Sequence, residues 1–323
     1  MKVFITGIAG FIGFHTAKRL LPSGFTISGV DNLNDYYDPA LKKARLAELG
    51  DQIDFQSLDI ADADALSDFV QQQRPDVVIH LAAQAGVRYS IENPFAYARS
   101  NLLGHLSVLE ACRHLPSFSH LIYASSSSVY GGNEKVPFSE DDRVDNPVSL
   151  YAATKKSDEL MSSTYAHLYG LKQIGLRFFT VYGPWGRPDM AYWTFTDKLL
   201  RGEPLPVFNN GDMRRDFTFI DDVTACIQAI AEKAPVFSKD ERPHRVYNIG
   251  NHTPVPLLEM IATLEEATGC KAKIDMKPMQ PGDVKQTYAD VSRLSADYGF
   301  NPKTPISEGL KSFVDWYRHY TNS

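Results

Sequence analysis

The first half of the chain alternates short apolar runs with longer segments that have the spacing of helices. Residues 2–6 form an apolar, β-branched run, and residues 14–21 repeat apolar positions at helical spacing. A second β-branched run covers residues 26–30 and ends at Asp31. Because a helix joins the two runs, this stretch predicts a strand, a helix and a second strand parallel to the first.

The same alternation continues as far as residue 178. It predicts helices over residues 39–49, 62–73 and 94–113, and a further helix that carries Tyr151 and Lys155. It predicts strands over residues 53–57, 76–81, 120–124 and 172–178. Strands that alternate with helices are typical of α/β proteins, so we expect a doubly wound parallel sheet.

The pattern of the sequence changes after residue 179, where prolines become frequent and the apolar runs become short. Here the pattern predicts helices over residues 191–201, 221–232, 257–268 and 306–320. It predicts short strands over residues 205–208, 216–219, 245–249 and 273–276. We therefore expect a first domain of residues 1–178 and a smaller mixed α/β lobe of residues 179–323, with some later segments returning to the first domain.

Composition and charge narrow the class of partner. A chain of 323 residues with a net charge of -6 offers no global electrostatic reason to bind nucleic acid or an anionic membrane surface. No apolar run is long enough to span a bilayer, and the sequence opens directly into the first predicted strand. Three cysteines lie far apart, without the paired spacing of a zinc site: Cys112, Cys226 and Cys270. We expect a cytoplasmic protein without a metal site.

Three glycines follow the first predicted strand and open the helix after it: Gly7, Gly10 and Gly13. Without side chains, such a turn lets backbone N–H groups at a helix N-terminus approach a pyrophosphate. Asp31 closes the second strand, where a carboxylate accepts hydrogen bonds from an adenosine ribose and repels a 2′-phosphate. The pattern indicates a Rossmann site for NAD; the alternative is a turn that needs glycine only for packing.

Tyr151 and Lys155 stand four residues apart on a predicted helix, which places a phenol and an ammonium on one face. The cation favours the phenolate, so the pair is a candidate proton-transfer device. Ser126 belongs to a serine run, residues 125–128, at the end of a predicted strand. The alternatives are a chance spacing on a solvated helix for the pair, and a capping role for the serine.

Taken in order, these motifs resemble the extended short-chain dehydrogenase/reductases, specifically the nucleotide-sugar epimerases and dehydratases. The segment from Asn101 to Gly104 resembles the central-helix motif of that family. Arg215-Asp-Phe217 and Asp221-Asp-Val223 resemble its substrate-lobe signature. The resemblance extends over essentially the whole chain. It implies an NAD-binding Rossmann domain followed by a lobe that binds a nucleotide sugar.

A finer resemblance is to the UDP-glucuronate 4-epimerases, carried by residues 31–39, 84–90, 181–190 and 280–283. It implies an isomerase that interconverts UDP-glucuronate and UDP-galacturonate through a transient 4-keto sugar, with NAD retained through turnover. It also implies a homodimer formed through residues 94–113 and 149–169. The alternatives are a UDP-glucuronate decarboxylase, a 4-epimerase of UDP-glucose and UDP-galactose, and a non-catalytic module that binds NAD or nucleotide sugars.

The resemblance assigns roles to individual residues. Tyr151 is the expected general base, Lys155 lowers its pKa and holds the nicotinamide ribose, and Ser126 hydrogen-bonds the sugar O4. The expected cofactor-binding residues are Gly7, Gly10, Phe11, Ile12, Gly13, Asp31, Asn32, Asp59, Ile60, Leu81, Ala82, Ala83, Gln84, Asn101, Tyr151 and Lys155. The expected substrate-binding residues are Arg88, Ser126, Ser127, Ser128, Thr180, Arg187, Val207, Phe208, Arg215 and Asp283.

Three positions depart from related enzymes. UDP-galactose 4-epimerases usually have an asparagine where Thr180 stands and a diphosphate-binding arginine near Gln280, so the charge contact falls to the arginines at 88, 187 and 215. Decarboxylating relatives commonly have a glutamate where Ser128 stands. We expect Ser127, Ser128 and Thr180 to bind the substrate carboxylate. For Arg88, the carboxylate, the pyrophosphate and a surface ion pair remain open.

Overall fold

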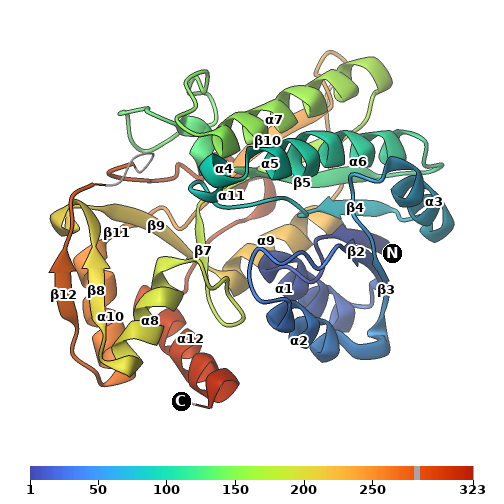
Figure 1. Cartoon of the computed structure of the whole chain (residues 1–323). Coiled ribbons are helices and arrows are strands. Elements are labelled where there is room, and N and C mark those ends of the chain that lie inside the picture. The colour runs from blue at the N-terminus through green and yellow to red at the C-terminus, as the bar shows by residue number, and fades with distance from the viewer. Residues whose placement is uncertain (280–283, 323) are drawn as a thin grey trace. The chain divides into compact units, whose positions relative to one another are not determined.

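A computed structural model describes residues 1–279 and 284–322 (Figure 1). The chain forms two compact units, which are treated separately here. The first comprises Met1–Gly131, Arg143–Arg177 and Thr224–Tyr247. The second comprises Gly132–Asp142, Phe178–Val223 and Asn248–Ser323. The division therefore passes beside the expected boundary at residue 178, and the chain also passes from one unit to the other at four further points.

A seven-stranded sheet forms the centre of the first unit. Its strands are β1 (Lys2–Thr6), β2 (Thr26–Asp31), β3 (Ile53–Ser57), β4 (Val77–His80), β5 (His120–Ser126), β6 (Gln173–Phe178) and β10 (His244–Ile249). They lie in the order β10-β6-β5-β4-β1-β2-β3. The pairs β1–β2, β2–β3, β1–β4 and β4–β5 are parallel. The predicted doubly wound sheet is confirmed, and its strand order reverses between β1 and β4, where such sheets bind ligands.

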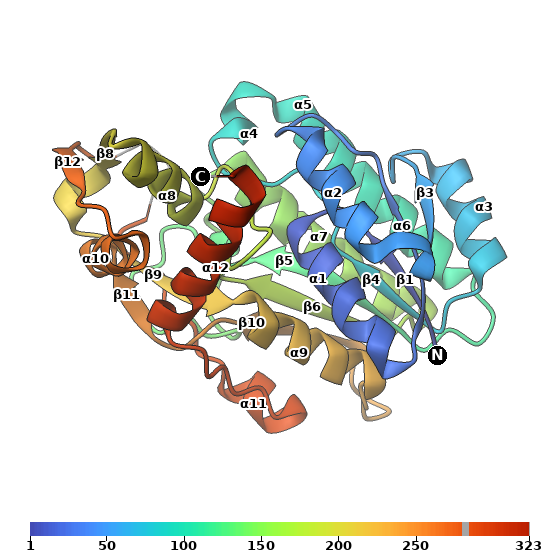
Figure 2. The same ribbon diagram turned by 90° about the horizontal axis from the view of Figure 1, so that it is seen from below.

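Helices cover both faces of this sheet, with α6 and α7 on one face and α1 and α9 on the other (Figures 1 and 2). The longer helices are α1 (Phe11–Leu20), α2 (Pro39–Leu49), α3 (Ala63–Gln73), α6 (Gly104–Arg113), α7 (Leu150–Tyr169) and α9 (Ile220–Glu232). The short ones are η1 (Leu21–Ser23), η2 (Gly50–Gln52), α4 (Tyr89–Glu92), α5 (Pro94–Tyr97) and η4 (Ser127–Tyr130). Sequence periodicity predicted all of the longer helices.

The helix expected over residues 94–113 is interrupted. Between α5 and α6 the backbone forms a π-helical segment, η3 (Ala98–Leu103), in which Asn101 is buried. A π-helical segment widens the helix locally and is frequent at functional sites. The sequence pattern missed it because one inserted residue hardly disturbs helical periodicity.

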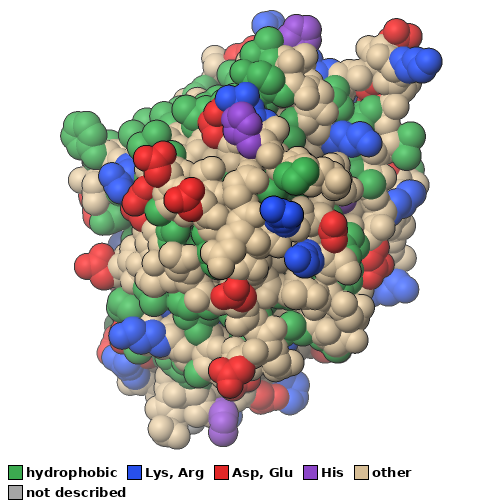
Figure 3. Space-filling view, turned by 90° about the vertical axis from the view of Figure 1, so that its right-hand side faces the viewer, with side chains coloured by type: hydrophobic (Ala, Val, Ile, Leu, Met, Phe, Trp, Pro, Cys, Tyr) green, Lys and Arg blue, Asp and Glu red, His purple; other side chains and the backbone are tan. Residues whose placement is uncertain are grey.

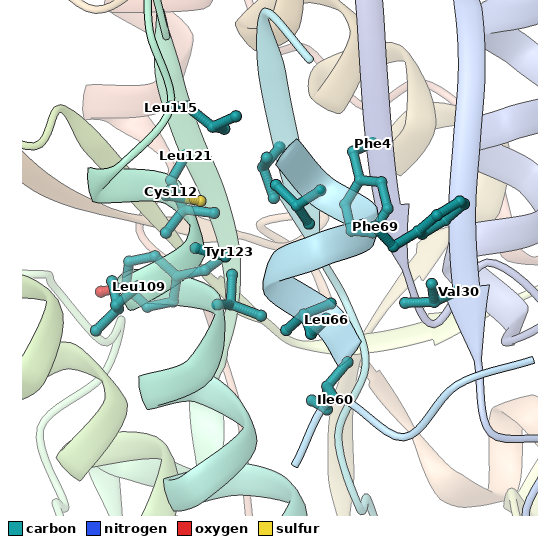
Figure 4. Close-up of a cluster of buried hydrophobic side chains, with 14 of the residues drawn as sticks. Phe4, Val30, Ile60, Leu66, Phe69, Leu109, Cys112, Leu115, Leu121 and Tyr123 are labelled. Carbon is teal, nitrogen blue, oxygen red and sulfur yellow. The ribbon is translucent and has the colours of Figure 1, made fainter. Parts of the chain in front are cut away.

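A hydrophobic cluster joins the sheet to α3 and α6 (Figure 4). Phe69 of α3 packs edge-to-face on Phe4 of β1, with ring centroids 5.9 Å apart. Leu109 of α6 and Tyr123 of β5 are both completely buried. Each large side chain withdrawn from water in this way contributes about 1.5–3 kcal/mol of hydrophobic stabilisation. The cluster fixes the strands whose carboxyl ends carry the candidate site.

The second unit contains two small sheets. One is mixed, with β9 (Arg214–Phe219) parallel to β7 (Thr180–Tyr182) and antiparallel to β11 (Pro254–Pro256). The other pairs β8 (Pro204–Val207) with β12 (Lys273–Met276) in parallel. The helical elements are η5 (Phe208–Gly211), α8 (Ala191–Arg201), α10 (Leu257–Thr268), α11 (Ser292–Tyr298) and α12 (Ile306–Thr321). The sequence pattern missed β7 and β11, since three residues are too few to show a period.

The surface in Figure 3 interleaves acidic and basic side chains, so neither sign of charge dominates that face. Over the residues that the structure describes, no helix combines the length and the hydropathy needed to cross a membrane.

Candidate active site

The turn between β1 and α1 is built so closely that side chains are excluded from it. Gly7 has a φ of +71°, and a Cβ there would lie 2.7 Å from the backbone nitrogen of Ala82. The N–H of Gly10 donates to the carbonyl of Gly7 at 2.9 Å. A Cβ on Gly13 would overlap that same carbonyl oxygen. The three predicted glycines are therefore brought together in one tight turn.

The N-terminus of α1 is open to an anion. Gly10 is its N-cap, and neither a capping side chain nor an acidic residue in the first turn occupies this end of the helix as the structure describes it. The N–H groups of Phe11, Ile12 and Gly13 thus belong to the first turn, where a helix has no partners of its own for them. With the helix dipole, they fit the pyrophosphate of a dinucleotide.

Asp31 lies buried at the carboxyl end of β2, as the sequence predicted. Its Oδ1 accepts the N–H of Leu33 at 2.8 Å and lies 3.5 Å from Nζ of Lys42, which is also buried. Lys42 also donates to Oδ1 of Asn34 at 3.1 Å. Neighbouring Asn32 is exposed. The ammonium offsets part of the carboxylate charge, so repulsion of a 2′-phosphate by Asp31 is weaker than the sequence argument assumed.

Two further predicted segments follow strands β3 and β4. Asp59 is half-buried; its Oδ1 accepts the N–H of Ala61 at 3.0 Å, and its Oδ2 pairs with Arg99 at 3.2 Å. Ile60 is buried beside it. After β4, the N–H of Ala82 donates to Oγ1 of Thr6 at 3.2 Å. Leu81, Ala83 and Gln84, the other residues of this predicted segment, lie in the loop that directly follows β4.

Asn101 holds the loop after β4 against α7. Its Oδ1 accepts the N–H of Gln84 at 2.8 Å, and its Nδ2 donates to the Gln84 carbonyl at 3.1 Å and to Oγ1 of Thr154 at 2.9 Å. Thr154 in turn donates to the carbonyl of Tyr151 at 2.8 Å. Both N–H donors of the amide predicted to bind cofactor are thus used within the protein, and Asn101 links the loop after β4 to the helix that carries the tyrosine.

Helix α7 presents Tyr151 and Lys155 from one face. Ser149 caps the helix by accepting the N–H of Ala152 at 3.1 Å. Tyr151 is half-buried and meets the ring of Tyr97 edge-to-face, with centroids 6.1 Å apart. The side chain of Lys155 is only 3% exposed, and its Nζ donates to the carbonyl of Ala124, the residue that precedes the serine run, at 3.0 Å. The ammonium of α7 and the end of β5 therefore lie together.

The serines divide into separate roles at the end of β5. Oγ of Ser126 accepts the N–H of Ser128 at 3.1 Å and donates to its Oγ at 3.0 Å. Ser126 therefore does cap the backbone, as the alternative interpretation expected. Its oxygen can still accept one further hydrogen bond, for example from a sugar hydroxyl. Ser127 is half-buried. Ser125 points away, to Oε1 of Glu159 at 2.7 Å.

A buried ion pair lies behind the serines, and the sequence reasoning missed it. Arg177 of β6 donates to both carboxylate oxygens of Glu159, at 2.8 and 2.9 Å, and to the hydroxyl of Tyr130 at 3.0 Å. Burial acts to raise the pKa of Glu159, but the Arg177 contacts outweigh it and leave that pKa below its ordinary value. The sequence did contain a signal for this pair: Glu159 stands four residues after Lys155, and residues at that spacing lie on the same face of a helix.

The predicted substrate residues of the second unit are distributed over three elements. Thr180 begins β7 and is partly buried. Arg187 pairs with both carboxylate oxygens of Asp189, at 3.0 and 2.6 Å. Val207 ends β8, is buried, and its carbonyl accepts the N–H of Lys277 at 2.8 Å, while Phe208 follows it, partly buried, in η5.

The signature around Arg215 is structurally anchored. Arg215 donates to the backbone carbonyls of Arg214 and Lys285, at 2.9 and 3.3 Å. The next residue, Asp216, is buried and accepts the N–H groups of Asn251, His252 and Ala289. The other predicted anion-binding residue, Arg88, belongs to the first unit. It directly precedes α4 and is exposed. Asp283 and Gln280 lie outside the described residues.

The family of the chain follows from comparison with known proteins. Residues 3–250 match the NAD dependent epimerase/dehydratase family. The chain belongs to this family. The predicted resemblance to nucleotide-sugar epimerases and dehydratases is thereby confirmed, as is NAD as the cofactor. The roles of individual residues remain predictions.

Among members of the epimerase/dehydratase family, a probable UDP-glucuronate 4-epimerase of Rhizobium meliloti (strain 1021) is 46% identical over 98% of this chain and 97% of the relative. UDP-glucuronate 4-epimerase 3 of Arabidopsis thaliana is 47% identical over 99% of this chain and 77% of the relative. The crystal structure of UDP-glucuronic acid 4-epimerase from Bacillus cereus, in complex with UDP-glucuronic acid and NAD, is 35% identical and has a TM-score of 0.90. That comparison covers 99% of this chain and 100% of the other.

Proposed function

We propose that the protein is an NAD-dependent 4-epimerase that interconverts UDP-glucuronate and UDP-galacturonate. The observation that carries the proposal is the hydrogen bond from Lys155, one helical turn after Tyr151 on α7, to the carbonyl of Ala124 near the end of β5, in the same unit as the open glycine turn. Relatives similar over nearly the whole chain are named for this reaction. Both the proton-transfer group and the cofactor cradle that such a reaction needs are therefore present.

The chemistry divides between the cofactor and the chain. NAD, which the glycine turn and the N-terminus of α1 would hold, would supply reversible hydride transfer at the sugar C4. Tyr151 takes the O4 proton as a phenolate and gives it back when the hydride returns. Lys155 stabilises the phenolate by its positive charge. The hydroxyl of Ser126 would turn from Ser128 to donate to O4 as negative charge develops there.

The substrate carboxylate creates a hazard, because a 4-ketone beside the C5 carboxylate is a β-keto acid that loses carbon dioxide easily. We assign Ser127 and Ser128 as hydrogen-bonding partners of the carboxylate, and Thr180 by resemblance alone. Hydroxyls hold a carboxylate without the charge of a glutamate, which would repel it. This role favours epimerisation over decarboxylation.

The UDP group needs cations and backbone groups. Arg187 and Arg215 carry positive charge in the second unit, and each is already oriented by acceptors within it. Arg187 would exchange its contact with Asp189 for a phosphate. Arg88 of the first unit is a further candidate for binding the carboxylate or the pyrophosphate. The backbone groups of Val207 and Phe208 are the candidates for binding uracil. Asp283 is proposed by resemblance alone for the uridine ribose.

Two properties of the whole protein complete the proposal. Exposed leucines on neighbouring helices, Leu106 of α6 and Leu160 of α7, suit burial against a second copy of the chain, so we propose a homodimer. Cys112, Cys226 and Cys270 are free thiols, which suits a reducing, cytoplasmic location.

The decisive experiment is incubation of the purified protein with UDP-glucuronate, without added NAD, and NMR analysis of the product. UDP-galacturonate is expected, because retained NAD is regenerated in each turnover. A UDP-pentose would instead favour the decarboxylase, and turnover of UDP-glucose with UDP-glucuronate untouched would favour the neutral-sugar epimerase.

Tyr151→Phe tests the proton transfer. The rate should fall by about 10²–10⁴-fold, the usual contribution of a general base, while UDP-glucuronate still binds. Tyr169→Phe removes a hydroxyl from the exposed end of the same helix and is the matched control. An undiminished rate in Tyr151→Phe would remove the tyrosine from the mechanism. Loss of activity with binding retained would exclude the non-catalytic module.

A further inference from the structure

Asp158 lies one helical turn after Lys155 on α7, and its side chain is 0% exposed. Its Oδ2 accepts a hydrogen bond from Nζ of Lys155 at 3.1 Å. Within residues 1–279 and 284–322, no hydrogen-bond partner for its Oδ1 is present. A carboxylate withdrawn from water with one oxygen unsatisfied is unfavourable unless a positive charge compensates it, and Lys155 supplies that charge.

The lysine ammonium is held from two directions. It has three N–H donors, of which one reaches Asp158 and another the carbonyl of Ala124 at 3.0 Å. One donor remains for the nicotinamide ribose or the phenol oxygen of Tyr151. Since rotation about the Cε–Nζ bond is fixed by the first two contacts, the direction of the third is fixed as well.

Other carboxylates near this lysine are occupied. Glu159 is adjacent to Asp158, but both of its oxygens bind Arg177. In the part of the chain that the structure describes, Lys155 forms its ion pair with Asp158. The negative charge that balances the catalytic ammonium in this buried region therefore comes from Asp158.

Burial favours the neutral form of two histidines and one tyrosine near the pair. Burial, and then the charge of Lys155, lower the pKa of His80 to about 3. Burial first, and then the charges of His80 and Lys155, also lower the pKa of His105. Burial raises the pKa of Tyr123. The titratable groups that face the pair or its tyrosine are His80 of β4, Tyr123 of β5, Tyr97 of α5, His105 of α6, and Tyr151 and Glu159 of α7.

We propose that Asp158 is a positioning residue for the reaction: it is the counter-ion that balances the charge of Lys155 and directs its remaining N–H toward the nicotinamide ribose or the catalytic tyrosine. The inference rests on the proposed function for its catalytic consequence. The buried ion pair between Asp158 and Lys155 does not depend on any substrate and can be tested separately.

The ion pair has a pH signature of known sign. Burial raises the pKa of Asp158 from 3.8 to about 6, with Lys155 opposing the rise. A group whose pKa is raised on folding contributes stability below its unfolded pKa and loses that contribution as pH rises through the folded value. The carboxyl of Asp158 therefore makes the protein lose stability between about pH 4 and pH 6.

Asp158→Asn keeps the shape and an acceptor oxygen but removes the charge. Without its counter-ion, the charge of Lys155 is uncompensated in a buried region, so the alkaline limb of the kcat profile should move to lower pH by about one to three units. Less NAD should also remain bound after purification at pH 9. Urea unfolding should lack the loss of stability between pH 4 and 6 that Asp158 causes in the wild type.

Two matched variants separate charge from structure. Asp158→Glu restores the carboxylate and should return the alkaline limb toward the wild-type position. Ser157→Ala removes a hydroxyl that donates to the carbonyl of Ala153 on the same helix, and should leave the limb unchanged. If Asp158→Asn proves unstable, Asp158→Ser removes the same charge in a smaller side chain, and its alkaline limb and NAD retention are compared with those of Asp158→Glu.

Identical alkaline limbs and NAD retention in the wild type and Asp158→Asn would overturn the proposal. A limb displaced equally in Asp158→Asn and Asp158→Glu would also overturn it, because shape rather than charge would then matter. Failure of the wild type to epimerise UDP-glucuronate would instead reject the proposed function. The NAD-retention and unfolding measurements would still test the ion pair in that case.

Discussion

At the scale of single residues, the candidate site depends on side chains that bond to other groups of the protein behind it. Glu159 joins Ser125 of the serine run to Arg177 of β6, and both carboxylate oxygens are used in doing so. Arg177 also contacts Tyr130, just after the serines. The main chain around Ser126 is therefore fixed by an ion pair on its buried side, while the other side remains for the substrate.

Removing one member of that pair should be costly, because the remaining charge has no partner in a buried region. Glu159→Gln is expected to lower the free energy of unfolding by about 3–5 kcal/mol at pH 7 in urea titrations. Lys156→Gln removes a partly exposed cation 3.6 Å from the same carboxylate and is the control. Its expected effect is within about 1 kcal/mol.

The same pair gives a pH dependence of opposite sign to that of Asp158. The pKa of Glu159 is lowered on folding, so its contribution to stability is complete above pH 4.5 and is lost as pH falls through the lowered value. The stability difference between the wild type and Glu159→Gln should therefore shrink below pH 4.5. A difference that stays constant down to pH 3 would contradict the pairing.

At the scale of elements, the β1–α1 turn shows why glycine is required by packing and not only by conformation. A Cβ on Gly13 would overlap the carbonyl oxygen of Gly7. By contrast, Gly24 after η1 has a φ of +82° and open space around its Cβ position. The two positions separate the cost of steric overlap from the cost of an unfavourable φ.

Gly13→Ala should displace the turn and abolish retention of NAD, measured by release of nucleotide from the denatured protein. Gly24→Ala should cost about 1 kcal/mol of stability from its backbone conformation and leave NAD content unchanged. Equal NAD content in the two variants would show that the turn tolerates a methyl group and does not approach the cofactor closely.

At the scale of the whole molecule, the proposed homodimer should depend on the exposed leucines of α6 and α7. Leu160 is 57% exposed on α7, and burying a charge there should shift the protein to the monomer. We therefore expect Leu160→Glu to halve the mass measured by light scattering at micromolar concentration. Val236→Glu changes a more exposed apolar residue in the loop after α9 and should leave the dimer intact. A monomeric wild type would reject the dimer.

The amino-acid sequence by itself determined the features that depend on short spacings. Alternating strand and helix periods predicted the parallel sheet, and helical spacing placed Tyr151 and Lys155 on one face. Glycines three apart, followed by Asp31, predicted a turn that binds the cofactor. These signals are local, because each arises from the geometry of one element or of two consecutive elements.

Only the tertiary structure decided which distant polar groups meet. Asn101 and Thr154 are 53 positions apart, yet their hydrogen bond ties the π-helical segment to α7. Asp158 is close to Lys155 in sequence, but its importance depends on burial that the sequence pattern did not reveal. Periodicity records which face of an element is apolar, whereas the partner of a buried charge is set by packing between elements.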